Sequence, residues 1–222
     1  AEVLDIKRRF FTQGEGLASE ADILATNTSA LAIGLIAEGL NHPERVVGTH
    51  FWNPPHVLPC VEVIRSSFTS DEVFEQAVAI MAAIGKEPIR VLKDVPGFLG
   101  NRMQHALQRE AISLVDNGVA SAEDVDRVVK YSFGLRMPLM GPLERADLGG
   151  LDTTSRVQAY LLPDLDDRIE VSESLQAKVD QGDLGAKTGR GYYDWPKGKL
   201  DKAIKERDLS LLKVLAAAGE KG

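Results

Sequence analysis

The chain has 222 residues, of which 33 are acidic and 26 are basic, and its formal net charge is -7 at pH 7. This acidic balance argues against a nucleic acid or an anionic membrane surface as the main partner. The length is enough for one large domain or two small ones with a real core. A single cysteine, Cys60, excludes an internal disulfide framework and favours a reducing, cytoplasmic setting. No run approaches the roughly 18 apolar residues of a membrane span, and no signal peptide opens the chain.

Helical and strand patterns alternate over the first 94 residues. Apolar residues at helical spacing predict helices over 2–18, 31–40 and 71–85. Short runs rich in β-branched residues predict strands over 22–29, 45–52, 60–65 and 87–94. Ser70 is placed to cap the third helix, which ends at Gly85. This alternation is typical of an α/β layer.

The character of the sequence changes after Asp94. A long apolar stripe predicts a helix over 95–118, and Ser121 with Asp124 forms a variant capping box that opens the next helix. Further helical segments are expected around 142–161, 171–181 and 201–218, with one extended piece at 191–195. We therefore expect an α/β domain over 1–94 followed by an all-α domain over 95–222.

Four polar residues stand where apolar patterns would otherwise continue: Ser29, His50, Glu62 and Asn101. Three of them have a structural interpretation, since Ser29 suits a helix N-cap, His50 can be a packed core histidine, and Asn101 can be an exposed helix residue. Glu62 interrupts a buried-looking strand and needs a partner, because an unpaired buried charge is costly.

The strands that carry His50 and Glu62 are neighbours in the sequence. A carboxylate beside an imidazole fixes its tautomer and raises its basicity, which makes the histidine a general base near neutral pH. We therefore expect hydrogen-bonding contact between these two side chains, with either a structural or a catalytic role for His50. No histidine, cysteine or carboxylate spacing in the sequence resembles a metal site.

Five segments in register resemble the L-3-hydroxyacyl-CoA dehydrogenase family: "ATNTSALAI", "GTHFWNPPHVLPCVEVI", "GKEPIRVLKDVPGFLGNRM", "GPLERADLGGLD" and "GAKTGRGYYDW". The likeness extends from Glu2 to about Trp195. It implies a Rossmann-type NAD-binding domain, here incomplete, over 1–94. It also implies a helical C-terminal domain over 95–222 that carries the contact of a homodimer. The implied reaction is oxidation of the 3-hydroxyl of an acyl-CoA to a ketone, with NAD as the hydride acceptor.

The resemblance also assigns roles to residues. His50 matches the general base, Glu62 the acid that orients it, Ser29 a hydroxyl that contacts substrate and cofactor, and Asn101 an amide near the reacting end of the substrate. The implied cofactor-side residues, in addition to Ser29, are Glu2, Lys7, Asn53 and Lys187.

Two departures from the family pattern affect the interpretation. Ala30 stands where the family usually has a second serine, which weakens a paired-hydroxyl clamp on the substrate. No G-x-G-x-x-G follows a strand, so the loop that cradles the pyrophosphate and the acid that reads the ribose are expected upstream of residue 1. Without that loop we expect the 222-residue chain to bind NAD weakly and to be inactive.

The sequence leaves three functions open. The first is an NAD-dependent 3-hydroxyacyl-CoA dehydrogenase of fatty acid β-oxidation. The second is a dehydrogenase of a free 3-hydroxy acid, such as carnitine or a sugar acid. The third is a non-catalytic dimeric member of the family, against which the joint presence of Ser29, His50, Glu62 and Asn101 argues.

Overall fold

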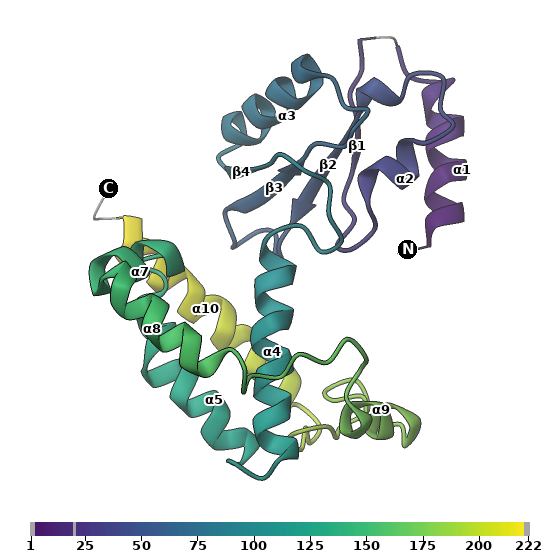
Figure 1. The fold of residues 1–222 in the computed structure, drawn as a ribbon. Helices are drawn as coiled ribbons and strands as arrows, with labels where there is room; N and C mark the ends of the chain where they lie inside the picture. Colours follow the sequence, from purple (N-terminus) through teal and green to yellow (C-terminus); the bar gives the residue numbers. More distant parts are fainter. Residues whose placement is uncertain (1–2, 20, 220–222) are drawn as a thin grey trace. The chain divides into compact units, whose positions relative to one another are not determined.

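The structure, a computed structural model, describes residues 3–19 and 21–219. The chain divides into two compact units, residues 1–105 and 106–222. Figure 1 shows the helices and strands of both units. Within the described ranges, no helix has the length and apolar character needed to cross a membrane.

The first unit is a small mixed sheet with helices on both faces, which confirms the α/β prediction for this part of the chain. Its strands run in the order β1-β2-β3-β4, with β2 and β3 antiparallel and the two outer pairs parallel. The elements are α1 (Leu4–Glu15), β1 (Leu24–Thr26), α2 (Ile33–Ala37), the short 3-10 helix η1 (Pro43–Arg45), β2 (Val46–Phe51), β3 (Cys60–Ile64), α3 (Asp71–Ala83) and β4 (Glu87–Val91).

The sheet separates two apolar clusters. Helices α1 and α2 lie on one face of the sheet and α3 lies on the other (Figure 1). On one face, Val46 and Ile64 pack with residues of α1 and α2. On the other face, Val47 and Val63 pack with Phe74 of α3. Adjacent strand residues point to opposite faces, so consecutive valines supply both layers.

The same alternation determines which face of the sheet each polar side chain lies on. His50 has the same parity as Val46, so it lies on the α1/α2 face of β2, where β3 places Glu62 directly opposite. On the same face of β2, two residues before His50, Gly48 lies under α2. A Cβ at Gly48 would come within 2.7 Å of the Ile33 Cδ1. A glycine is therefore needed at this position for α2 to pack on the sheet.

The long helix expected over 95–118 begins later than predicted, because α4 runs from Gly100 to Asp116. The preceding residues form a turn, since Pro96 lacks an amide donor and both Gly97 (φ 76°) and Phe98 (φ 52°) have left-handed backbone. This turn orients the first amides of α4.

The second unit is helical, as predicted, and consists of the rest of α4 with α5 (Ala122–Tyr131), α6 (Phe133–Arg136), α7 (Pro142–Gly149), α8 (Leu151–Leu161), α9 (Glu173–Asp180) and α10 (Lys199–Gly219). The single helix expected around 142–161 is two helices, because Gly150 (φ 89°) interrupts it. Ser121 caps α5 as predicted, since its Oγ accepts a hydrogen bond from the Asp124 amide at 3.1 Å. The extended piece expected near 191–195 contributes one isolated bridge, between Arg190 and Asp194.

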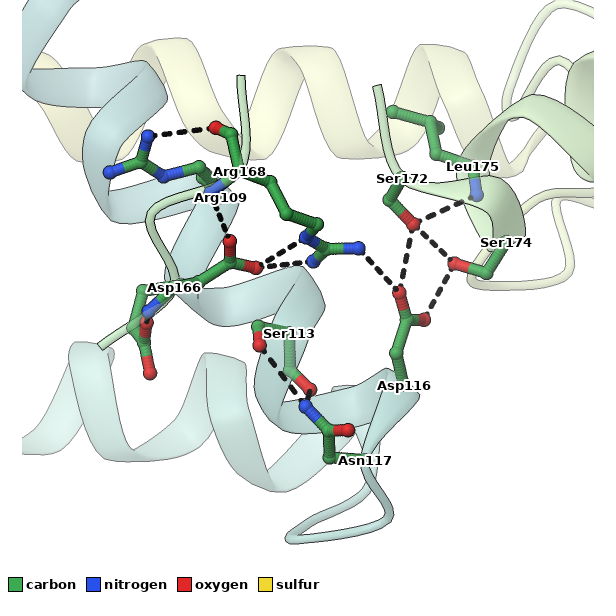
Figure 2. A network of polar contacts seen from close by, with 10 residues as sticks. Arg109, Ser113, Asp116, Asn117, Asp166, Arg168, Ser172, Ser174 and Leu175 are labelled. Atoms are coloured by element: carbon green, nitrogen blue, oxygen red, sulfur yellow. Dashed lines mark hydrogen bonds and ion pairs between the residues drawn. The ribbon is translucent and has the colours of Figure 1, made fainter. Parts of the chain in front are cut away.

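Little of the second unit is buried. Of the residues that the structure describes between 106 and 219, Val125 and Ser172 alone are buried as whole residues. A polar network ties the segment between α8 and α9 to α4 instead (Figure 2). Asp116 of α4 accepts hydrogen bonds from Ser172 at 2.8 Å and from Ser174 at 2.6 Å.

Asp166 is the centre of the other half of this network. Its carboxylate accepts hydrogen bonds from the Arg168 side chain, at 2.7 Å for Nε, and from the Arg168 amide at 2.9 Å. These bonds, led by the guanidinium, lower the pKa of Asp166 to about 2. The Asp166 amide donates to Glu110 of α4 at 2.9 Å, so the segment is fixed by backbone and side chain together.

We expect Asp166→Asn to destabilise the protein in a pH-dependent way. The folded pKa lies below the unfolded value near 3.8, so the ionised Asp166 stabilises the fold above that value and loses this effect as the pH falls toward 2. Denaturant unfolding should show a difference between wild type and variant that is largest at neutral pH and shrinks below about pH 4. A difference independent of pH would contradict the assignment, and Asp164→Asn, at an exposed position near this network, is the control.

Candidate active site

The predicted contact between His50 and Glu62 is present. The His50 Nδ1 lies 2.7 Å from the Glu62 Oε2, and the two side chains are 5% and 2% exposed. The antiparallel register of β2 and β3 produces this contact because it pairs the two residues directly.

The second oxygen of Glu62 is also occupied. Its Oε1 accepts hydrogen bonds from the amides of Leu99 and Gly100, at 2.9 and 3.0 Å, where α4 begins. Burial by itself would raise the pKa of Glu62, but the hydrogen bonds from His50, Gly100 and Leu99 outweigh it and the pKa is lowered. Glu62 is therefore an ionised carboxylate even though it is buried.

The contact with Glu62 determines what the imidazole of His50 can do. With Nδ1 occupied as a donor to a carboxylate, Nε2 is the ring nitrogen left to accept a proton. The ring is flanked by Trp52 and Phe98, with centroid distances of 5.3 and 5.7 Å. An oriented imidazole of this kind is suited to general acid–base catalysis.

Asn101 and Ser29 are also brought together. Asn101 is the second residue of α4, and its side-chain amide donates to the Ser29 carbonyl at 2.8 Å. Ser29 is exposed and lies between β1 and α2, and α2 begins only at Ile33, with Ala32 at the N-cap position. Ser29 is therefore not the helix N-cap, and the first turn of α4 contacts both Glu62 and the Ser29 segment.

Asp94 is a site residue that the sequence analysis missed. Its Oδ2 accepts a hydrogen bond from the Gly34 amide at 2.8 Å and so caps α2, which follows the Ser29 segment. Burial raises the pKa of Asp94 despite the hydrogen bonds from the Gly34 and Ile33 amides. The available signal was indirect, because the sequence before α2 offers alanine where a capping side chain is expected.

The remaining predicted residues are more dispersed. Lys7 is half-buried on α1, and Asn53 is exposed two residues beyond the end of β2. Lys187 is exposed and belongs to the second unit. Glu2 lies outside the described residues.

The first unit offers polar groups that fit the nicotinamide end of a dinucleotide. Open α/β sheets bind ligands outside the carboxyl ends of their parallel strands. There, β1 is followed by Asn27, whose Oδ1 accepts from the Phe51 amide at 3.2 Å, and by Ser29, while β2 carries His50 and leads to Asn53. Across residues 3–19 and 21–219, no group of three or more histidine, cysteine or carboxylate side chains is placed to hold a metal ion.

Two family models match the chain consecutively. Residues 1–95 match the 3-hydroxyacyl-CoA dehydrogenase NAD-binding domain, and residues 97–195 match the 3-hydroxyacyl-CoA dehydrogenase C-terminal domain.

Curated relatives include enzymes with two kinds of substrate. The chain is 34% identical over 213 residues to 5-formyl-3-hydroxy-2-methylpyridine 4-carboxylate 5-dehydrogenase of Mesorhizobium japonicum, covering 96% of this chain and 69% of the relative. It is 39% identical over 196 residues to human mitochondrial hydroxyacyl-coenzyme A dehydrogenase, covering 87% of this chain and 61% of the relative. It is 40% identical to a probable 3-hydroxybutyryl-CoA dehydrogenase of Bacillus subtilis, covering 88% and 67% of the two chains.

Solved structures give the same two groups. A crystal structure of the pyridine carboxylate dehydrogenase, described as an NAD⁺-dependent dismutase, superposes with a TM-score of 0.96 at 33% identity, covering 99% of this chain and 71% of that one. The 3-hydroxybutyryl-CoA dehydrogenase of Escherichia coli superposes with a TM-score of 0.70 at 36% identity, covering 88% and 41%.

Proposed function

Because the chain belongs to the 3-hydroxyacyl-CoA dehydrogenase family, whose N-terminal domain binds NAD, we propose that it oxidises the 3-hydroxyl of a 3-hydroxyacyl-CoA to the ketone, as a step in fatty acid breakdown. The observation that carries this proposal is the buried contact between His50 and Glu62.

In this proposal His50 is the general base. Its Nε2 takes the proton of the substrate hydroxyl, and Glu62 stabilises the imidazolium that forms because the carboxylate is already ionised and hydrogen-bonded on both oxygens. Bound NAD supplies the hydride acceptor for the carbon that carries this hydroxyl. Proton removal by a fixed imidazole is worth roughly 10² to 10⁴-fold in rate.

The other predicted residues orient the reactants. Asn101 and Ser29 would hold the substrate's reacting end in line with His50, and their mutual contact fixes the segment that carries the Ser29 hydroxyl. Asn53 would contact the nicotinamide, and Glu2, Lys7 and Lys187 would make further cofactor contacts, as the family resemblance implies.

We expect His50→Gln and Glu62→Gln to lower kcat by about 10² to 10⁴-fold while NAD binding stays nearly unchanged. The first variant removes the base, and the second replaces a carboxylate that accepts on both oxygens with an amide that accepts on one. Steady-state kinetics and NAD titration on the full-length protein measure both effects.

The chain offers a matched control pair. His42 and Glu44 also make a histidine–carboxylate contact, at 3.2 Å, but both are about half exposed. His42→Gln and Glu44→Gln should leave kcat within about twofold. Unchanged turnover in His50→Gln would remove the general-base role, whereas absence of turnover in the wild type would support a non-catalytic member of the family.

A second candidate is a dehydrogenase that acts on a free carboxylic acid. The match to the pyridine carboxylate dehydrogenase covers 96% of the chain. Because α10 has 21 residues, a match of this length must include at least part of that helix. That helix lies beyond residue 195, where the family's C-terminal model ends. The TM-score of 0.96 over 99% of the chain favours the same candidate.

The two candidates differ in what they require of the substrate. If the first is correct, kcat/KM for 3-hydroxybutyryl-CoA should exceed that for free 3-hydroxybutyrate by at least about 10²-fold, because a tail that binds remotely contributes to transition-state stabilisation. The second candidate predicts the opposite order, with turnover of 5-formyl-3-hydroxy-2-methylpyridine 4-carboxylate, the compound in the name of that relative. NADH formation at 340 nm measures all three reactions.

We also infer that the protein forms a homodimer through its helical unit. Apolar side chains of this unit are widely exposed, including Leu135 (69%), Leu143 (81%), Leu148 (73%) and Tyr160 (83%). A largely apolar hollow of about 460 Å³ adds to this surface, and it is lined by residues such as Val129 of α5, Leu135 of α6, Leu139 after α6 and Val214 of α10. A symmetric partner would cover a surface that a single helical layer cannot bury.

Light scattering of the full-length protein at micromolar concentration tests this inference. We expect a dimer for wild type and a shift to monomer for Leu135→Asp, because a carboxylate in the largely apolar hollow would lose its hydration when a partner covers it. Leu17→Asp, at a 90% exposed position in the first unit, should remain dimeric. A monomeric wild type would contradict the proposed interface.

A further inference from the structure

Trp52 occupies a position beside His50 that the proposed mechanism does not use. It follows Phe51, the last residue of β2, and its indole centroid lies 5.3 Å from the imidazole centroid at an angle of 55°. Of the two rings that flank His50, Phe98 is fully buried whereas Trp52 is partly exposed. Trp52 is therefore the aromatic neighbour of His50 that a ligand can reach.

Gly100 provides the space that this indole occupies. A Cβ at Gly100 would lie 2.8 Å from the Trp52 Cη2 and 3.2 Å from Cε2, and nearer still to Cζ2. These atoms belong to a rigid ring, so a methyl group at Gly100 cannot be accommodated unless the indole moves. The first residue of α4 therefore fixes Trp52 by steric fit while its amide holds Glu62.

The chemistry of His50 places substrate close to this ring. Nδ1 is occupied by Glu62, so a substrate hydroxyl must come within about 2.6–3.2 Å of Nε2. At this range, substituents on the carbon that carries the hydroxyl are near the indole. A flat aromatic substituent gains most from such a neighbour, since paired aromatic rings are worth about 0.5–1.5 kcal/mol beyond their buried area.

We propose that Trp52, held in place by Gly100, is a specificity-determining residue that favours substrates with a planar ring on the reacting carbon. This rests on the proposed function, because it takes His50 as the base. It does not depend on whether the substrate is a thioester or a free acid.

The test uses two matched substrate pairs that differ only in a phenyl or a methyl group on the reacting carbon. These are 3-hydroxy-3-phenylpropionyl-CoA with 3-hydroxybutyryl-CoA, and the corresponding free acids. In the full-length protein, the phenyl-to-methyl ratio of kcat/KM should fall at least about tenfold in Trp52→Ala and less in Trp52→Phe. A ratio is insensitive to the fraction of enzyme that is folded.

A double-mutant cycle tests the part played by Gly100. Gly100→Ala should lower the same ratio by displacing the indole, but should have little further effect in the Trp52→Ala background. Trp195→Ala, in the second unit, is the matched control and should leave the ratio unchanged. If Gly100→Ala does not fold, the Trp52→Ala and Trp52→Phe pair still decides the proposal.

The possible results distinguish the role of Trp52 from the proposed function. Turnover with an unchanged ratio in Trp52→Ala would overturn the role of Trp52 and leave the proposed function standing. Equal effects of Gly100→Ala in both backgrounds would overturn the steric fit. Failure of the wild-type protein to oxidise any of the four substrates with NAD would overturn the proposed function itself, and this inference with it.

Discussion

The arrangement of the candidate site depends on one buried carboxylate that accepts hydrogen bonds on both sides. Glu62 receives the His50 imidazole on one oxygen and the first amides of α4 on the other. The amides at a helix N-terminus favour negative charge, so they offset the cost of keeping Glu62 ionised away from water. The sheet and the helix therefore meet at a single group, and displacing either would affect the histidine.

The start of α4 also organises the segment between β1 and α2. Asn101 contacts the Ser29 carbonyl, and Asp94, just before the turn into α4, caps α2 through the Gly34 amide. The eight residues from Asp94 to Asn101 thus connect to the histidine, the carboxylate and the serine segment. A short turn with special backbone geometry performs this task because it brings several donors close together in sequence and in space.

Much of the first unit could be predicted from local patterns. The runs rich in β-branched residues predicted β2 and β3, and the placement of His50 and Glu62 on neighbouring strands predicted their contact. The hydrogen-bond partners of the second Glu62 oxygen could not be predicted. They are backbone amides 37 and 38 residues away, which carry no side-chain signal. The same holds for Asp94, which caps a helix 60 residues earlier.

Helix boundaries were predicted less well than helix positions. The apolar stripe of α4 continues into the turn before it, so periodicity extended the predicted helix over Pro96 and Phe98. The break at Gly150 was missed because the helical pattern continues across it. Steric limits on the backbone, rather than hydrophobic pattern, set these ends.

The left-handed backbone of Phe98 has a consequence for efforts to make the protein more heat-resistant. A non-glycine residue at φ 52° costs roughly 1–2 kcal/mol, so a rule that matches residue type to backbone angle would recommend glycine or asparagine here. The Phe98 ring is fully buried, however, and truncating a buried phenylalanine typically costs about 3–5 kcal/mol. The substitution that relaxes the chain would leave a void 5.7 Å from the imidazole centroid, and the protein would lose both stability and a packing contact of the His50 ring.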